Sequence, residues 1–250
     1  MRPTLLALGL AACAPPPPPA PQDSAPVPQA SPPVPPAIPP VPPDSPPVPP
    51  DSTPTSAAPP PGFVDLRAAL PTACFTPGYA APDNFTGAPL PGYAAPGAWL
   101  LATPAAALAR VQSALTADHL TLVIFDAYRP RRASAAMVAW AERTGQRHLI
   151  TSGYIARRSG HNHGHTIDLG LATPDCQQLD MGTPWDTLDP RSHTAAATGL
   201  AKKNRLRLLQ AMRAAGFRDY PREWWHFHFP LAGTHARDVP YGPHEAPEGS

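Results

Sequence analysis

The chain has 250 residues, a formal net charge of +1 and only 15% charged residues. A nearly neutral chain without a basic run gives no support for a nucleic-acid partner, and we expect none. No stretch approaches the roughly 20 apolar residues that a membrane-spanning helix needs. The chain instead divides by composition into a short N-terminal signal, a proline-rich segment and a long segment of ordinary composition.

Residues 1–13 have the pattern of a bacterial lipoprotein signal peptide. Arg2 supplies a positive charge, residues 4–10 are mostly apolar, and small residues follow. The run Leu10-Ala-Ala-Cys13 resembles the lipobox, in which the cysteine is lipidated and becomes the mature N-terminus. We expect Cys13 to anchor the protein in a membrane, and Ala14 favours the periplasmic face of an outer membrane. The alternative is a soluble secretory signal cut near Ala12.

Residues 14–62 are predicted to be an unfolded linker. They hold 24 of the 41 prolines and lack the apolar surface that would offset the entropy of ordering the chain. Such a composition favours extended polyproline II structure, rising about 3.1 Å per residue. The segment is therefore predicted to be a spacer between the membrane and a folded domain.

Residues 63–250 are predicted to form one domain with its own core. Cys74 and Cys176 are its two cysteines, and an exported protein folds where disulfides form. Their separation along the chain does not decide whether they pair, so both states stay open.

The hydrophobic pattern of this domain mixes helices and strands. The predicted helices are 103–116 (with Thr103 as N-cap and Pro104 at the first position), 131–144 closed by Gly145, and 204–215 ending at Gly216. The predicted strands are 120–125, a half-buried strand at 167–171, and 224–229. Because the order is not a strict strand–helix alternation, the pattern predicts the α+β class.

Two segments carry residues suited to metal chemistry, 159–168 and 223–226. Imidazole and carboxylate groups are the ligands of zinc sites that keep an open position. Asp168 alternates with Ile167 and Leu169, so its side chain is expected to point away from the core towards a site. His161 would lie on the wrong face of a continuous strand, and we therefore expect a turn at Gly164.

Glu223 and His226 are three residues apart, and in a regular strand their side chains would point to opposite faces. A tight turn or a half-helical kink would bring them together. This spacing suits a catalytic base next to a metal ligand better than a pair of ligands.

Beyond these residues, the chain resembles the D-alanyl-D-alanine dipeptidases. The signatures are Ser-x-His161-x-x-Gly-x-x-x-Asp168 and Glu223-x-Trp-His226. Further matching segments are Tyr79, 83–87, 126–130, 181–183 with Asp186, and 191–193. The resemblance covers roughly 65–229 in the expected order. It implies a single α+β domain whose central antiparallel sheet is flanked by helices, with a zinc site in a cleft on the sheet.

The resemblance also implies a role for each matching residue. His161, Asp168 and His226 would hold one Zn²⁺, and Glu223 would be the base that activates the attacking water. Arg129 would stabilise the oxyanion. Residues implied in substrate binding are Tyr79 and Asp186, which with Glu223 would hold the substrate's free amine, and Asp126 and Ser159, which would shape the pocket.

Some positions depart from the family pattern. His163 and His165 add imidazoles between the expected ligands, so His163 paired with Asp168 remains an alternative, and His228 is a weaker one. The predicted activity is zinc-dependent hydrolysis of free D-Ala-D-Ala in the turnover or scavenging of cell-wall peptides. The alternatives are a zinc carboxypeptidase or endopeptidase that trims peptidoglycan stem peptides, and a zinc-bearing binding module without catalysis.

Overall fold

The computed structural model describes residues 58–242. The predicted signal peptide, its Cys13 and the predicted linker up to residue 57 lie outside the described residues, and those predictions remain predictions. Within the described part, no helix is both long enough and apolar enough to cross a bilayer.

A five-stranded sheet forms the centre of the domain, with the order β2-β4-β5-β7-β6. Its strands are β2 (Cys74–Phe75), β4 (Thr121–Asp126), β5 (Thr166–Ala172), β6 (Arg218–Tyr220) and β7 (Glu223–His228). All neighbours are antiparallel except β2 and β4, which are parallel. The expected antiparallel sheet is therefore confirmed for four strands, while the short edge strand β2 departs from it. The helices and strands together confirm the α+β class.

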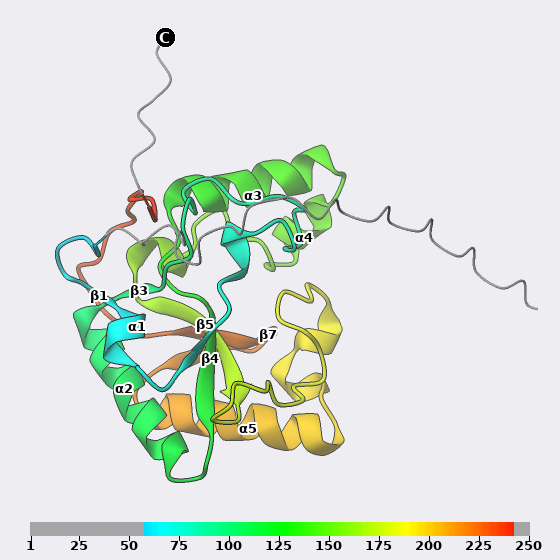
Figure 1. Cartoon of the computed structure of the whole chain (residues 1–250). Helices are drawn as coiled ribbons and strands as arrows, with labels where there is room; N and C mark the ends of the chain where they lie inside the picture. The colour runs from blue at the N-terminus through cyan, green and yellow to red at the C-terminus, as the bar shows by residue number, and fades with distance from the viewer. Residues whose placement is uncertain (1–57, 243–250) are drawn as a thin grey trace, which may run out of the picture. The chain divides into compact units, whose positions relative to one another are not determined.

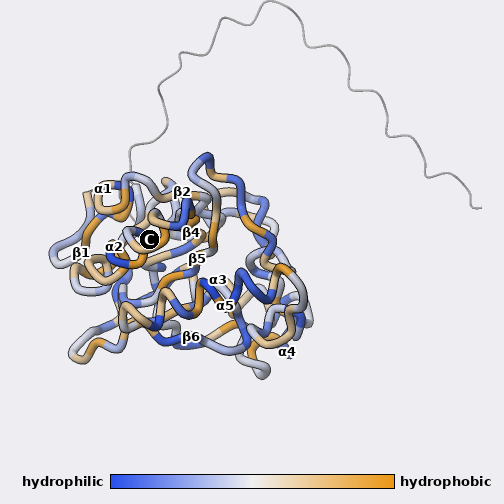
Figure 2. Tube along the Cα trace, turned by 90° about the horizontal axis from the view of Figure 1, so that it is seen from below, coloured by the Kyte–Doolittle hydropathy of each residue, from blue (hydrophilic) through white to orange (hydrophobic). Residues whose placement is uncertain are grey.

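Helices surround this sheet, as Figure 1 shows. The longer ones are α2 (Ala102–Thr116), α3 (Arg131–Arg143) and α5 (Gly199–Ala214), and the short ones are α1 (Leu66–Ala69) and α4 (Arg147–Thr151). A second, two-stranded sheet pairs β1 (Phe63–Asp65) with β3 (Trp99–Leu101). Four 3-10 turns complete the described elements: η1 (Gly78–Ala80), η2 (Gly160–His163), η3 (Pro190–Ser192) and η4 (Thr194–Ala196). Along the outer segments hydrophobic and hydrophilic stretches alternate, as expected for elements that bury one side (Figure 2).

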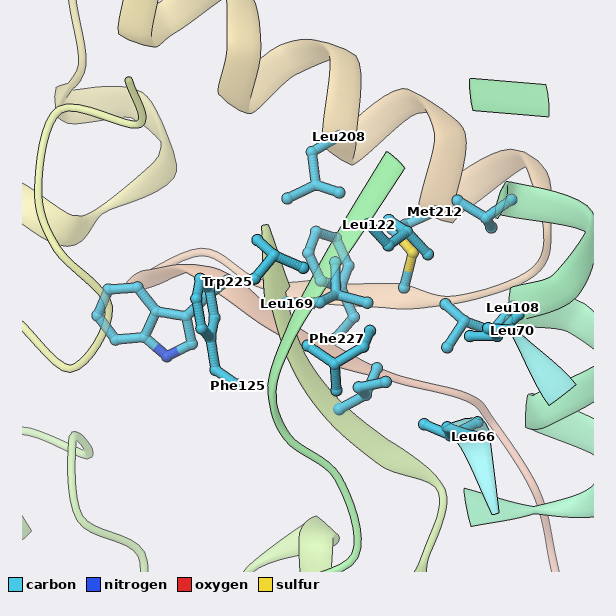
Figure 3. Packing of buried hydrophobic residues seen from close by; sticks show 14 of the residues in the cluster. Leu66, Leu70, Leu108, Leu122, Phe125, Leu169, Leu208, Met212, Trp225 and Phe227 are labelled. Carbon is cyan, nitrogen blue, oxygen red and sulfur yellow. The ribbon is translucent and has the colours of Figure 1, made fainter. Parts of the chain in front are cut away.

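The main apolar core lies between the sheet and the helices α1, α2 and α5. Leu208 and Met212 of α5 pack there against Leu169 of β5 and Phe227 of β7, as Figure 3 shows. These side chains are almost fully buried, and burying each contributes about 1.5–3 kcal/mol relative to exposure. A second cluster is largely aromatic, and it joins α3 and α4 to the small sheet.

Strand β5 differs from the half-buried strand that the alternating pattern predicted. All seven of its residues are buried, including Asp168 and Gly170. The reason is its position as the third of five strands, with β4 on one side and β7 on the other. Ile167 and Leu169 face the core, while the opposite face lies beneath the buried polar groups of the pocket described below.

Two helix starts also differ from prediction. α2 begins at Ala102, and its N-cap is Leu101 rather than Thr103, because β3 continues directly into the helix. Pro104 is tolerated in the first turn, where the backbone N–H has no partner within the helix. α5 begins at Gly199, before the predicted start at residue 204. The strands 120–125 and 224–229 and the helix 131–144 are confirmed to within one residue at each end.

A disulfide joins Cys74 of β2 to Cys176 in the loop after β5, which answers the question that the sequence left open. Their Cα atoms lie 5.7 Å apart although 102 positions separate them along the chain. The bond ties the two-residue edge strand β2, which shortly precedes Tyr79, to the loop after β5.

Candidate metal centre and active site

Three neighbouring strands place one polar residue each at the same level of the sheet. Asp168 of β5 pairs with Asp126 at the end of β4 on one side and with His226 of β7 on the other. Side chains of directly opposed residues share one face of a sheet. This row therefore brings Asp126, Asp168 and His226 together from segments far apart in the sequence.

His161 reaches the same place from outside the sheet. It lies in η2, which ends at Gly164 in the left-handed conformation, with φ of 75°. The expected turn between His161 and Asp168 is thus present at the expected glycine. A Cβ at Gly164 would also lie 2.3 Å from the ring of Phe63, so a larger residue would not fit.

The ligating atoms of His161, Asp168 and His226 converge on one point. Asp168 Oδ1 lies 3.3 Å from His161 Nε2 and 3.1 Å from His226 Nδ1, and the two nitrogens are 3.3 Å apart. Asp168 Oδ1 is buried and has no hydrogen-bond partner among the described residues. Two imidazoles and a carboxylate oxygen aimed at a shared centre fit a divalent cation such as zinc.

The surroundings hold His161 in the form that binds metal. Its Nδ1–H donates to the carbonyl of Ala127 at 2.7 Å, which leaves Nε2 with its lone pair towards the site. Such a second hydrogen bond orients metal-binding imidazoles in general. Asp126 Oδ2 also lies 3.3 Å from the same Nδ1 and strengthens this orientation.

The protonation of the group favours a cation as well. Burial opposes ionisation of Asp168, but His161 and His226 outweigh it and hold the pKa of this carboxyl well below its usual range. Burial lowers the pKa of His226, although Asp168 beside it acts in the opposite direction. An ionised carboxylate next to a neutral imidazole is the state in which both groups bind metal.

Arg129 is held in place beside this group. Its Nε donates to Asp126 Oδ2 at 3.0 Å, and Nη2 forms ion pairs with Asp126 Oδ2 at 2.9 Å and with Asp168 Oδ2 at 3.7 Å. The guanidinium also lies 5.0 Å from the ring centre of Tyr79. Tyr93 donates to the other oxygen of Asp126 at 2.6 Å. Both oxygens of Asp126 thus accept hydrogen bonds within the protein, and Arg129 is the residue of this pair that lines the pocket.

Glu223 lies next to the three converging side chains, with Oε2 3.6 Å from His226 Nδ1. Both residues belong to β7, so the predicted half-helical kink is wrong. What brings them together is an irregularity of the ladder: Asp219 pairs with Phe227, but Tyr220 pairs with Glu223. Burial, with Asp168 and Asp186 nearby, raises the pKa of Glu223 well above its usual value.

Tyr79 and Asp186 form a second polar pair on the pocket wall. The Tyr79 hydroxyl donates to Asp186 Oδ2 at 2.7 Å, and burial, reinforced by Asp168, raises the pKa of Asp186 to about 8. The backbone of Asp186 is left-handed, with φ of 58°, a conformation that Asp and Asn adopt more readily than most residues. The ring of Trp185 lies 4.9 Å from that of Tyr79, tilted by 54°, and supports this wall.

A pocket of about 280 Å³ opens over these groups. Of the residues proposed from the sequence, those that line it are Tyr79, Arg129, Ser159, His161, Asp168, Asp186, Glu223 and His226. Ser159 also caps η2, where its hydroxyl oxygen accepts the N–H of His161 at 3.3 Å. Asp126 does not line the pocket, and its contacts place it behind Arg129 and His161, so its predicted part in shaping the pocket could only be indirect.

The additional histidines lie outside the converging group. His163 Nδ1 lies 3.1 Å from the Thr234 hydroxyl, and His165 Nδ1 lies 3.3 Å from that of Thr166. Neither residue, nor His228, lines the pocket or belongs to the three-residue metal group. The geometry therefore favours His161 over His163 as the partner of Asp168.

Sequence reasoning missed several pocket residues. Tyr154, Arg158 and Tyr220 line the pocket, and Tyr93 holds Asp126 from behind. Arg158 had a signal in the sequence, since it directly precedes the motif that begins at Ser159. The tyrosines had none, because their positions depend on how distant loops pack.

Comparisons with known proteins agree with this geometry. A family model described as D-ala-D-ala dipeptidase matches residues 60–242. A D-alanyl-D-alanine dipeptidase of Enterococcus faecalis is 37% identical over 184 residues, which cover 66% of this chain and 90% of the relative. One from Streptomyces coelicolor is 37% identical over 165 residues (60% and 82%), and one from Escherichia coli is 33% identical over 174 residues (69% and 86%). The chain belongs to the D-Ala-D-Ala dipeptidase family of metallopeptidases.

Proposed function

We propose that this protein is a zinc-dependent D,D-dipeptidase that hydrolyses free D-Ala-D-Ala. The observation that carries the proposal is the convergence of His161, Asp168 and His226 beside the buried Glu223. Zinc, when bound there, supplies Lewis-acid activation of water and of the scissile carbonyl. Two neutral imidazoles, one carboxylate and an open side towards the pocket suit that role.

The remaining steps fall to protein side chains. Glu223 takes the proton of the attacking water and then delivers it to the leaving amine. Burial favours the protonated form of its carboxyl, which suits a group that must hold a proton between these two steps. Arg129 donates to the oxygen on which negative charge develops, using the N–H groups that Asp126 does not occupy.

The free amino group of the substrate is proposed to bind between Asp186 and Glu223. Both carboxyls are buried and have raised pKa values, so each lacks a nearby cation sufficient to favour its charged form. The ammonium group of a dipeptide provides that cation. An N-acylated substrate would leave the carboxyls without it and would add bulk, at a cost of several kcal/mol.

The test compares release of D-Ala from free and N-acetylated D-Ala-D-Ala, with a murein pentapeptide as third substrate. We expect kcat/KM for the free dipeptide to exceed that for the acetylated one by at least about 10³-fold. Asp186→Asn should narrow this gap without disturbing the backbone, because Asn also adopts positive φ. Comparable or faster cleavage of the blocked peptides would contradict the dipeptidase assignment and favour a carboxypeptidase that trims stem peptides.

We further propose that the enzyme acts outside the cytoplasm as a lipoprotein at the periplasmic face of an outer membrane. The support is the sequence Leu10-Ala-Ala-Cys13 followed by the proline-rich residues 14–62. An enzyme placed there cannot deplete the cytoplasmic dipeptide, which favours turnover or scavenging of cell-wall peptides. Full-length protein should partition with membranes and Cys13→Ser should not. A mature N-terminus beyond Cys13 without acylation would contradict the anchor.

A further inference from the structure

One arginine that lines the pocket has no charged partner among the described residues. Two arginines line it, Arg129 and Arg158. Arg129 is buried and bound to Asp126, as described above. Arg158 is exposed, and within residues 58–242 its side chain forms neither a hydrogen bond nor an ion pair. The adjacent Arg157 differs, because it pairs with Glu142 at 2.6 Å and does not line the pocket.

The other charges of the pocket are mostly negative. Asp168, Asp186 and Glu223 line it, and they suit a metal ion and an ammonium group. They would repel the second charge of a free dipeptide, its C-terminal carboxylate. A carboxylate in this pocket therefore needs a cation of its own. Arg129 pairs with Asp126, and its remaining N–H groups are assigned above to the developing oxyanion, so Arg158 is the arginine of the pocket that remains for the carboxylate.

The backbone holds Arg158 close to the reacting centre. It directly precedes Ser159, whose side chain and carbonyl accept hydrogen bonds from the N–H groups of His161 and Asn162. The base of the Arg158 side chain is thus three residues from His161 along a segment fixed by these bonds. Arg158 is exposed and lines the pocket, and the planar fork of N–H donors on a guanidinium matches a carboxylate.

We propose that Arg158 binds the C-terminal carboxylate of the substrate and so restricts the enzyme to peptides that end next to the scissile bond. This inference rests on the proposed function only in needing a substrate with a free C-terminal carboxylate. A carboxypeptidase substrate has the same group, so the two proposals can fail separately.

The experiment measures kcat/KM of the full-length protein on D-Ala-D-Ala and on its C-terminal amide. Four proteins are compared: wild type, Arg158→Ala, Arg158→Lys and, as matched control, Arg157→Ala. Arg158→Ala should lower kcat/KM for the acid about 10–100-fold, chiefly through KM, as expected for losing a hydrogen-bonded charge. The kcat/KM for the amide should change little, so the ratio of kcat/KM for acid and amide should fall towards one. Arg158→Lys should restore part of the preference for the acid, and Arg157→Ala should behave as wild type.

An equal loss on acid and amide, or no loss on either, would overturn the inference, because Arg158 would then act on folding or not at all. If wild type cleaves neither dipeptide but releases D-Ala from murein pentapeptide, the proposed dipeptidase function fails. The same four proteins are then measured on that pentapeptide and its C-terminal amide. A loss of the preference for the acid in Arg158→Ala would support the proposed role of Arg158 on that substrate as well, and an unchanged preference would contradict it.

Discussion

The two faces of the central sheet are built from the same strands but follow different physical rules. On one face Leu169 packs against α5, and the cross-strand pairs Leu122–Leu171 and Ile124–Leu169 are all aliphatic. On the other face the row Asp126–Asp168–His226 is polar: both carboxyls are buried, and His226 is partly exposed. Apolar burial is non-directional and roughly proportional to area, so the stability contributed by the first face depends on how much apolar surface it buries. Buried charges require defined partners, so the stability of the second face depends on the positions of the groups that pair with its carboxyls.

The contrast explains how a pocket rich in charge can exist beside a conventional core. Asp126 illustrates this, because its two oxygens are taken by Tyr93 and Arg129 and one also contacts His161. Asp168 Oδ1 is the exception, since it is buried without a hydrogen-bond partner among the described residues. Such an unsatisfied atom is costly in a purely structural site, and a bound cation removes that cost.

The largest effect should come from removing a metal ligand on the polar face. His161→Ala should reduce zinc from about one ion per domain to a small fraction and abolish turnover, because two remaining ligands hold zinc poorly. Metal content after dialysis against a chelator measures this. His163→Ala is the matched control, since the side chain lies two residues away and outside the three-residue group. Loss of zinc in the control but not in His161→Ala would reverse the assignment.

A smaller but still large effect should separate chemistry from metal binding on that same face. Glu223→Gln keeps the shape of the side chain and removes its ability to accept a proton, so kcat should fall by about 10²–10⁴-fold. Zinc content should stay unchanged, because Glu223 is not one of the three converging ligands. Turnover close to wild type would exclude Glu223 as the base.

The apolar face should respond in stability and not in chemistry. Leu169→Ala should lower the free energy of unfolding by about 2–5 kcal/mol, as the residue is fully buried between β4 and α5. The volume-conserving change Leu169→Met should cost less than about 1.5 kcal/mol. Denaturant unfolding measures both. At temperatures where the variants remain folded, kcat and zinc content should match wild type; a selective loss of zinc would mean that the two faces are coupled.

Much of the domain could be predicted from the sequence because the signals are local. Alternation and turn residues located β4, β5, β7 and α3, and Gly164 marked the turn that redirects His161. The chemical nature of the site was also visible, since imidazoles and carboxylates at motif spacing indicate a metal whatever the surrounding fold. These are properties of residue type and short-range backbone geometry, which neighbouring positions suffice to determine.

The tertiary structure alone decided the features that depend on distant segments meeting. The register of β4, β5 and β7 puts Asp126 behind Arg129 instead of in the pocket, and the irregular β6–β7 ladder aligns Glu223 with His226. The pairing of Cys74 with Cys176 is of the same kind. So is the contrast between Arg157, which pairs with Glu142, and Arg158, which forms no ion pair within residues 58–242. Contacts across many residues depend on the packing of the whole chain, and no local pattern encodes which partners that packing brings together.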